Sequence, residues 1–486
     1  MIFSFLYTAS AVLASSSAPS MRAQVSMCAP AARLAAQQLC GWVESQGGSA
    51  SNVVIGPTKY GLGLLAGEDM KVGDAAVSIP QACIMSAATR DVGVELQELV
   101  ALVPEEFWAC RLALLLLAER SEGDAARLAS YMRTLPATYT VPLFWSSEAI
   151  ASLKYPTVSK RLLKTAKFVQ SFASEHLTGK TKAFNGLSVG ADALGWAVAA
   201  CSSRAFRVGG ERVLCPIIDI GNHAPRGVAN CEVRGTLGGK IELVALRSIS
   251  LGEEVTYCYG DLSNDDFLLD YGFLPSDPPN PNDDCVLSWA DGQLLSTACS
   301  TAGLPEPRAE WQSAALRLCL PRDLQSIKVT KVGLEDAAMA ACRVAAASDA
   351  AALRKAQGGK RPLPPAGEVR ALKIAAAVCA LALSGFPEPE VKGAAAPADG
   401  KSDGATLSDG GSSLAMRFLE EKRGVCSAAL EGLGERIKAL QTGEARAELR
   451  GAQKGKAASG VRKQSAARKG PARPKASGFG ASSSRK

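Results

Sequence analysis

Two short stretches of this sequence combine polar and aromatic side chains that could bind a ligand. Residues 216–225 read PIIDIGNHAP, in which an apolar run stops at Gly221 and is followed by Asn222 and His223. His223 is one of only two histidines among 486 residues. A lone histidine is more often a hydrogen-bonded core residue than a ligand-binding one, so the case for a site depends on its neighbours.

The second stretch, residues 252–273, reads GEEVTYCYGDLSNDDFLLDYGF and contains three tyrosines. A turn leads into an expected strand on which Tyr257 and Tyr259 share one face, because side chains two residues apart in a strand point the same way. Tyr271 follows twelve residues after Tyr259. Alternating tyrosines usually pack in a core. Their hydroxyls become candidates for chemistry because an Asn-His pair and a glycine turn accompany them in the same chain.

That glycine turn is GLGLLA at residues 61–66, which fits the relaxed dinucleotide-binding pattern G-x-G-x-x-A. The pattern binds phosphate only where a helix follows the glycines. Here a turn and a strand-like run follow, so we reject a Rossmann site. Gly61 and Gly63 can still let a ligand approach the backbone closely.

The elements that must position these residues follow from apolar periodicity. A helix over residues 31–48 has apolar positions about 3.6 residues apart and ends at two glycines. Short runs bounded by turn residues predict strands at 51–56, 62–67, 75–80, 213–218, 231–233, 241–246 and 254–257. Helical spacing predicts helices at 96–103, 107–120, 125–135, 146–153, 159–176 and 196–206.

The chain is mostly helical in pattern after residue 275. A low-complexity linker or loop is expected at 393–413, and a charged amphipathic helix at 414–440. The order of elements predicts an α+β protein, in which a β-rich unit is interrupted by helices and followed by a helical domain.

Composition fits a globular chain of two or three domains, with 47% hydrophobic and 21% charged residues. The apolar stretches near 112–117 and 372–386 are too short to span a bilayer, so no membrane partner is expected. Fourteen scattered cysteines without a Cys-x-x-Cys pair argue against a zinc finger or a disulfide framework. With two histidines, no metal site is expected.

The two ends of the chain differ from its body. Residues 1–20 contain an apolar segment of signal-peptide length, and residues 20–30 have serine and arginine without acid, as transit peptides do. Residues 452–486 hold ten Lys/Arg and no Asp/Glu. Subtracting those ten charges from the net +7 leaves −3 for the rest of the chain. This tail is expected to be disordered, with nucleic-acid contact through phosphates as the alternative.

In order and spacing, these pieces resemble the SET-domain protein methyltransferases, in the subgroup of the Rubisco large-subunit lysine methyltransferase and the actin-histidine methyltransferases. The resemblance covers roughly residues 33–450. It is carried by GLGLLAGEDMKVGDAAVSIP, LLLLAERSEGDAARLASYMRTLPATYTVPLFWSSEAIASL, SSRAF, PIIDIGNHAP and GEEVTYCYGDLSNDDFLLDYGF. It implies a β-rich SET fold with a pseudoknot, interrupted by a helical insertion and followed by an all-α substrate-binding domain.

The domains that it implies are bounded as follows: a targeting or disordered segment at 1–32, SET core at 33–86, helical insertion at 87–185, SET core with the site motifs at 186–276, a helical domain at 277–451 with a loop at 393–413, and a basic tail at 452–486.

The resemblance also implies S-adenosylmethionine as cofactor and assigns its contacts. Tyr60, Gly61 and Leu62 match a segment whose backbone binds the cofactor. Asn222 and His223 match the dipeptide that holds its adenosine. Ala224 stands where many members have Ser or Thr, and Asn230 matches a residue that supports the chain crossing there.

The remaining matches concern the reacting groups. Arg204 matches an arginine at the methionine end of the cofactor, where a guanidinium can pair with a carboxylate, and it also borders the substrate. Asp219 matches a residue beside the channel for the target side chain. Tyr259 and Tyr271 match the catalytic tyrosines; Tyr259 also contacts substrate, and Tyr271 also lies beside the sulfonium. A methyl group would pass in line to a neutral lysine amine, with tyrosine hydroxyls orienting it.

The expected activity is therefore methylation of a lysine in a non-histone protein. Histone-directed relatives commonly carry a cysteine-rich zinc segment after the last tyrosine, and this chain has none. The alternatives are a protein-histidine methyltransferase, or a non-catalytic SET scaffold that binds partners or nucleic acid through the tail. We expect a monomer in the plastid, with cytoplasm or nucleus as alternatives because the two termini point to different compartments.

Overall fold

The computed structural model describes residues 30–88, 92–288, 293–307, 309–319, 326–387 and 407–443. The targeting-like segment at 1–29, most of the 393–413 loop and the basic tail lie outside these residues. The chain forms two compact units. The first comprises Met1–Ser288, Lys328–Lys331 and Leu381–Ala428; the second comprises Trp289–Ile327, Val332–Ala380 and Ala429–Lys486.

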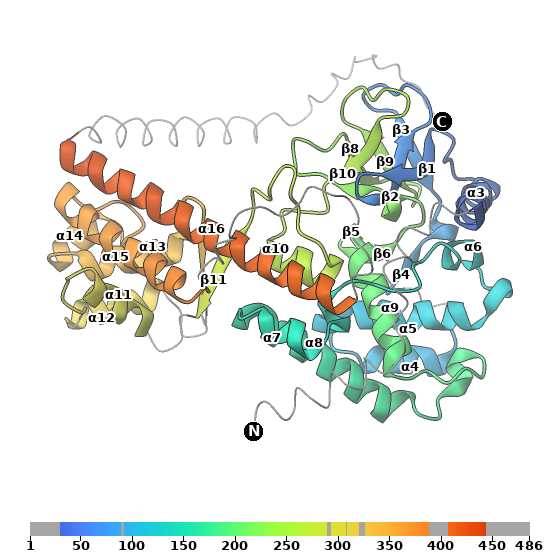
Figure 1. The fold of residues 1–486 in the computed structure, drawn as a ribbon, viewed down its shortest axis with the longest axis horizontal. Coiled ribbons are helices and arrows are strands. Elements are labelled where there is room, and N and C mark those ends of the chain that lie inside the picture. Colours follow the sequence, from blue (N-terminus) through green and yellow to red (C-terminus); the bar gives the residue numbers. More distant parts are fainter. Residues whose placement is uncertain are drawn as a thin grey trace, which may run out of the picture. The chain divides into compact units, whose positions relative to one another are not determined.

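A seven-stranded sheet is the centre of the first unit (Figure 1). Six of its strands run in the order β1 (Val53–Thr58), β2 (Gly61–Ala66), β10 (Glu254–Tyr257), β8 (Cys231–Gly235), β9 (Ile241–Ala245) and β3 (Ala75–Ile79). The seventh, β7 (Asn222–His223), pairs parallel with β10. A second sheet has the order β4 (Met85–Ser86), β6 (Glu211–Leu214) and β5 (Phe206–Val208).

Helices fill the sequence between the N-terminal and central strands. They are α4 (Val94–Leu102), α5 (Trp108–Ser121), α6 (Ala129–Met132), α7 (Ser147–Ser152), α8 (Pro156–Phe172) and α9 (Ala191–Arg204). Helix α3 (Pro30–Ser45) precedes β1. The middle of α5 is buried on every side, which explains its unbroken run of leucines at 114–117. Helix α5 packs against α9, whose small residues allow a close approach.

The second unit is mainly helical. Its described elements include α11 (Gln293–Thr301), α12 (Glu310–Cys319), α13 (Asp336–Ala346), α14 (Ala350–Lys355) and most of α15 (Pro365–Ser384). Strand β13 (Gly333–Leu334) also belongs to this unit, whereas β11 (Asp284–Ser288) and residues 328–330 of β12 (Ser326–Thr330) belong to the first. The long helix α16 (Leu407–Thr442) contributes its first 22 residues to the first unit. The expected α+β class is confirmed.

Most sequence-predicted elements are present with small shifts of their ends, but four predictions need correction. Residues 125–135 form only the short helix α6, since Pro136 follows closely. The predicted loop at 393–413 is wrong from residue 407, where α16 begins. The predicted helix 196–206 ends at Arg204, because Phe206 belongs to strand β5.

The predicted strand at 213–218 is the fourth correction, and it matters for the site. Strand β6 ends at Leu214, and Pro216, which has no N–H, cannot continue the ladder. The N–H of Ile218 then donates to the carbonyl of Pro216 at 2.8 Å, which closes a γ-turn with φ +67° at Ile217. This sparsely populated backbone conformation precedes the short turn Ile218–Ile220 that carries Asp219.

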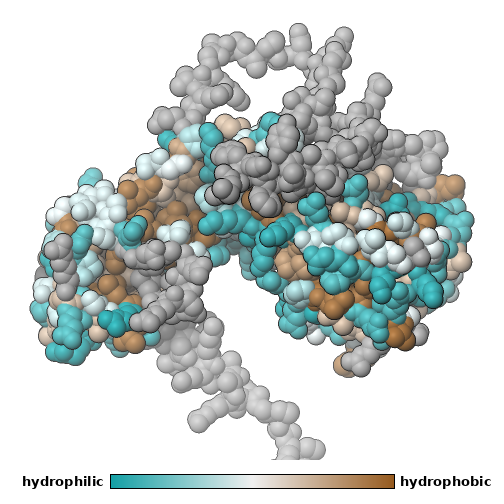
Figure 2. Space-filling model, turned by 90° about the horizontal axis from the view of Figure 1, so that it is seen from below, coloured by the Kyte–Doolittle hydropathy of each residue, from teal (hydrophilic) through white to brown (hydrophobic). Residues whose placement is uncertain are grey.

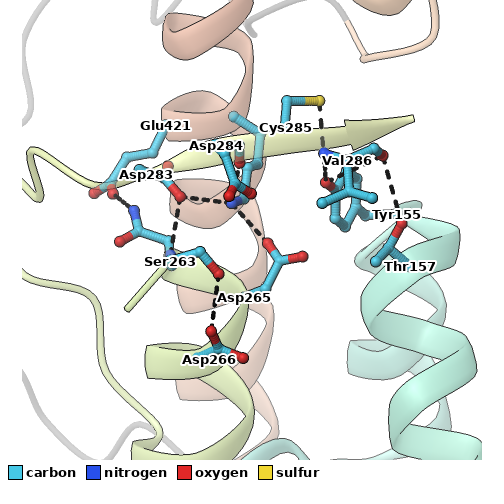
Figure 3. A network of polar contacts seen from close by, with 12 residues as sticks. Tyr155, Thr157, Ser263, Asp265, Asp266, Asp283, Asp284, Cys285, Val286 and Glu421 are labelled. Carbon is cyan, nitrogen blue, oxygen red and sulfur yellow. Dashed lines mark hydrogen bonds and ion pairs between the residues drawn. The ribbon is translucent and has the colours of Figure 1, made fainter. Parts of the chain in front are cut away.

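A buried lysine connects α16 to the chain before the last predicted site tyrosine. Lys422 on α16 is 0% exposed, and its Nζ lies 2.6 Å from carboxylate oxygens of both Asp265 and Asp283. It also donates to the carbonyl of Asp284 at 2.6 Å. Figure 3 shows the Asp265 and Asp283 carboxylates pointing toward the place where this ammonium lies. Burial opposes its charge, but the two carboxylates raise the pKa of Lys422.

The surface seen in Figure 2 is largely hydrophilic, with smaller hydrophobic patches among the teal residues. That distribution fits a fold that buries most of its large apolar side chains. Within the described part of the chain, no helix combines the length and the apolar character needed to cross a membrane.

Candidate functional site

Asn222 and His223 form strand β7, and both contact neighbouring elements directly. The Asn222 amide Nδ2 donates to Thr58 Oγ1 at 2.9 Å and to Glu254 Oε1 at 2.8 Å. The main-chain N–H of Tyr259 donates to His223 Nδ1 at 3.2 Å. An accepting Nδ1 places the imidazole proton on Nε2. Burial lowers the pKa of His223 to about 4, so the ring is neutral near pH 7.

Gly63 on β2 lies beneath this asparagine, and the position allows no side chain. A Cβ there would lie 2.5 Å from Thr58 Cγ2 and 2.7 Å from Asn222 Nδ2. Asn230, which precedes β8, is hydrogen-bonded to β10. Its Nδ2 donates to the carbonyl of Glu254 and its Oδ1 accepts from the N–H of Thr256, both at 2.8 Å. The glycine pattern and the Asn-His pair, read separately from the sequence, therefore belong to one packed arrangement.

The three tyrosines of the second sequence stretch form one aromatic cluster. Ring centroids of Tyr257 and Tyr259 are 5.0 Å apart, and those of Tyr259 and Tyr271 are also 5.0 Å apart. The Tyr259 hydroxyl donates to the carbonyl of Gly221 at 2.8 Å. Burial raises the pKa of both Tyr259 and Tyr271, so both hydroxyls are neutral at physiological pH.

The segment that carries Tyr271 also supports the histidine. After the short helix α10 (Asn264–Asp266), Phe267 packs with its ring centroid 4.8 Å from that of His223 and 5.8 Å from that of Tyr271. Gly272 follows with φ +74°. A Cβ at Gly272 would meet the Thr140 main chain at 2.9 Å, so the turn after Tyr271 requires glycine.

Arg204 and Asp219 form a buried ion pair. Arg204 Nη1 lies 3.0 Å from Asp219 Oδ2, and the Tyr131 hydroxyl donates to the same oxygen at 2.8 Å. Burial raises the pKa of Asp219, and the Arg204 guanidinium and the Tyr131 hydroxyl oppose that rise. The sequence interpretation placed this guanidinium against a cofactor carboxylate. In the structure one of its nitrogens binds Asp219, whose main-chain oxygen it also reaches at 3.4 Å.

Three polar atoms around this pair are buried and have no hydrogen-bond partner among the described residues. They are Asp219 Oδ1, Arg204 Nε and the hydroxyl of Tyr139. Burying a polar group without a partner costs free energy, which a bound polar ligand or water would recover. An acceptor, a donor and a hydroxyl are thus available to a polar group that enters the site.

A cavity of about 320 Å³ borders the tyrosine cluster. Its lining includes Arg204, Tyr257, Tyr259 and Tyr271 together with residues of β5 and β8. Among the residues that the structure describes, no group of three or more His, Cys, Asp or Glu side chains is arranged to hold a metal ion. The polar side chains that line this cavity include the neutral hydroxyls of the tyrosines and the guanidinium groups of Arg204, Arg207 and Arg226.

Tyr60, Gly61 and Leu62 lie at the turn between β1 and β2 and at the start of β2. They are not among the residues that line the cavity beside the tyrosine cluster. Gly61 has φ +104°, a conformation that favours glycine. Tyr60 is 51% exposed, and its hydroxyl donates to the carbonyl of Asp277 at 3.3 Å. This turn leads directly into Gly63, which contacts Asn222.

The sequence interpretation missed four contributors to this arrangement. Thr58 and Glu254 hold Asn222, and Tyr131 and Tyr139 accompany the Arg204–Asp219 pair. Thr58 and Glu254 lie close in sequence to the glycine turn and to the tyrosines, and that proximity could have indicated them. Tyr131 and Tyr139 come from the helical insertion, and no local pattern marks them.

The central part of the chain is similar to known proteins. A family model described as the SET domain matches residues 61–260. The chain contains a SET domain. The match runs from the first site glycine to the residue after Tyr259, and it confirms the resemblance stated from sequence.

Among curated relatives, this SET-domain chain is 29% identical over 254 residues to the chloroplastic fructose-bisphosphate aldolase-lysine N-methyltransferase of Arabidopsis thaliana, covering 49% of this chain and 51% of the relative. It is 26% identical over 244 residues to the human N-lysine methyltransferase SETD6, covering 46% and 50%. It is 25% identical over 271 residues to the actin-histidine N-methyltransferase of Danio rerio, covering 50% and 44%. The chain spans about half the length of these relatives.

The fold agrees over a longer stretch. The crystal structure of the SET domain of LSMT bound to lysine and AdoHcy superposes with a TM-score of 0.59 at 18% identity, covering 84% of this chain and 93% of that one. The structure of Rubisco LSMT bound to AdoMet gives a TM-score of 0.58 at 18% identity, with the same coverage. The predicted SET-type α+β architecture is thereby confirmed.

Proposed function

We propose that this SET-domain chain is an S-adenosylmethionine-dependent methyltransferase that modifies a lysine of a non-histone protein. The observation that carries the proposal is the contact of His223 with Tyr259, which lines one cavity together with Tyr271 and Arg204. Arg204 is in turn paired with Asp219. Relatives named as lysine N-methyltransferases of aldolase and of the Rubisco large subunit support this substrate class.

The residues present fit this cofactor. Gly61 has the positive φ that permits a close backbone turn, and Arg204 Nε remains a buried donor without a partner. Main-chain groups of Tyr60, Gly61 and Leu62 and the side chains of Asn222 and His223 would hold the cofactor, as would Arg204 and Tyr271. When bound, the cofactor supplies an electrophilic methyl group on a sulfonium.

The chain's own contribution is positioning. Neutral His223 presents Nε2–H as a donor, because Nδ1 accepts from Tyr259. Tyr259 and Tyr271 stay protonated, so they orient neighbouring groups without competing as nucleophiles. Asp219 Oδ1 is a buried acceptor for the proton-bearing nitrogen of the target side chain. A lysine amine must be neutral to react, and a low-polarity channel favours that form.

Histidine is the alternative target, because the chain is about as similar to an actin-histidine N-methyltransferase as to several lysine enzymes. A non-catalytic SET scaffold is the other alternative. We propose a plastid location, supported by the transit-like composition of residues 20–30 and by two relatives named as chloroplastic. The domain boundaries and the monomeric state remain predictions.

The test is methyl transfer by the purified full chain. The chain is incubated with S-adenosylmethionine carrying a labelled methyl group and a lysate, beside a Tyr259→Phe variant. A labelled protein band that depends on Tyr259 supports catalysis. Cofactor binding without any transfer would replace the proposal by the scaffold.

A further inference from the structure

Two arginines face each other across the hairpin that borders the site cavity. Strands β5 and β6 are joined through Gly209 and Gly210, whose φ angles are +59° and +91°. The register of the hairpin puts Arg207 directly opposite Arg212. Like charges directly opposite each other destabilise an antiparallel pair, so this arrangement costs stability unless something neutralises it.

Arg212 is fixed in place and incompletely hydrogen-bonded. Its guanidinium carbon lies over the ring of Trp108, 4.0 Å from the ring centroid, in a cation–π contact that restrains the side chain. Its Nε is buried without a hydrogen-bond partner. Burial lowers the pKa of Arg212, and the charge of Arg207 lowers it further.

Nearby acids do not neutralise this pair. Across the described residues, no carboxylate lies within ion-pair distance of Arg207 or Arg212. Glu211 accepts instead from the Ser86 hydroxyl at 2.7 Å. Asp270 attracts Arg212 and Arg161 from beyond ion-pair distance, and burial raises the pKa of Asp270 to about 6. Near pH 7 this carboxylate is mostly ionised, so it compensates the charge of Arg212 in part but not that of Arg207.

One member of this pair borders the cavity of the proposed methyl transfer. Arg207 lines that cavity together with Tyr259 and Tyr271. The other charged side chains of the lining each have an opposite partner. These pairs are Arg204–Asp219, Arg226–Asp261 and Glu232–Arg234. Arg207 therefore supplies the uncompensated charge of the lining, with Arg212 beside it.

We infer that Arg207 and Arg212 form a subsite for a carboxylate side chain of the substrate polypeptide, near the residue that accepts the methyl group. This inference rests on the proposed function and specifies its substrate class as lysines with an acidic neighbour. A carboxylate there would relieve the repulsion between the two arginines and accept their free N–H groups. This contact would strengthen binding of the substrate polypeptide, so its effect should appear mainly in KM.

The test uses short peptides with one central lysine in an alanine and glycine background. Each peptide carries either Glu or Gln at one flanking position, scanned over both sides of the lysine. Transfer from labelled S-adenosylmethionine is measured for the full chain, for Arg207→Glu and for Lys167→Glu. Lys167 is an exposed lysine on α8 that does not line the cavity, so the control has the same change of charge.

The inference predicts that at one position Glu raises kcat/KM about 10-fold over Gln, as a charge-assisted hydrogen bond would. The effect should lie in KM, weaken with salt and persist in Lys167→Glu. Arg207→Glu should reverse the preference, leave cofactor affinity unchanged and keep or raise the melting temperature, because it removes the like-charge contact. Equal kcat/KM for Glu and Gln at every position, or an unchanged preference in Arg207→Glu, overturns the subsite alone. No transfer to any lysine peptide by the full chain overturns the subsite and the proposed function together.

Discussion

His223 accepts a hydrogen bond at Nδ1 from the main-chain N–H of Tyr259, 3.2 Å away and 36 residues later in the chain. This contact joins the two sequence motifs that were recognised separately. It also requires a neutral imidazole, since a protonated Nδ1 would be a donor facing a donor.

Stability should therefore depend on the protonation of His223. Burial lowers the pKa of His223 from 6.5 to about 4. Between these two pH values His223 is protonated in the unfolded chain but neutral in the folded chain. The free energy of unfolding should fall as pH drops through this window. Partial solvent contact limits the loss to about 2 kcal/mol. Urea unfolding at a series of pH values measures it, and His223→Gln should flatten the slope; an unaltered slope would be evidence against a buried neutral histidine.

Gly63→Ala should destabilise the first unit, because its Cβ would overlap Thr58 and the Asn222 amide. Overpacking of this kind costs about 1–3 kcal/mol. Cofactor affinity should fall as well, since Asn222 must move. Gly41→Ala is the control, because a Cβ at Gly41 on α3 meets nothing within 4 Å and should raise stability by about 0.5–1 kcal/mol. Thermal melting and cofactor titration measure both; equal behaviour of the two variants would refute the close packing at Gly63.

Tyr131→Phe and Tyr139→Phe form a matched pair of buried hydroxyl deletions. The Tyr131 hydroxyl donates to Asp219, so its loss should cost about 1.5–3 kcal/mol. The Tyr139 hydroxyl has no partner, so its removal should change the free energy of unfolding by about 0.5 kcal/mol or less. Denaturant unfolding compares the two variants. A larger loss for Tyr139→Phe than for Tyr131→Phe would contradict this hydrogen-bond assignment.

Lys422→Met should be the most destabilising single change considered. It leaves Asp265 and Asp283 buried without their cation, which typically costs about 3–5 kcal/mol. Because Asp265 lies on α10, just before Tyr271, turnover should also fall. Lys438→Met, at an exposed position of the same helix, should change stability by no more than about 0.5 kcal/mol. Similar urea midpoints for both variants would show that the buried ion pairs contribute little.

Much of the fold was predictable because its signals are local. Short runs bounded by turn residues predicted β2, β3 and β9, and helical spacing predicted α5. The strand expected at 213–218 failed because an apolar run is also compatible with a buried turn, and the isoleucines pack as a turn after Pro216. Linear periodicity does not distinguish the two.

The candidate site was predictable where its residues form motifs. The glycine turn, the Asn-His pair and the tyrosines stand in recognisable order, and the structure brings Gly63, Asn222, His223 and Tyr259 together. Tyr131 and Arg212 have no such pattern around them. Tyr131 reaches Asp219 from 88 residues away, and the role of Arg212 depends on which residue lies opposite it in a hairpin. Such relationships arise from tertiary packing alone.

The most direct test of the central claim is tandem mass spectrometry of the protein that the full chain labels in a lysate with methyl-labelled S-adenosylmethionine. The account predicts a methyl group on a lysine side-chain nitrogen, with transfer reduced about 100-fold in Tyr259→Phe while cofactor affinity stays unchanged. A methyl group on histidine would contradict the lysine assignment. Equal labelling by Tyr259→Phe would remove Tyr259 from the catalytic site.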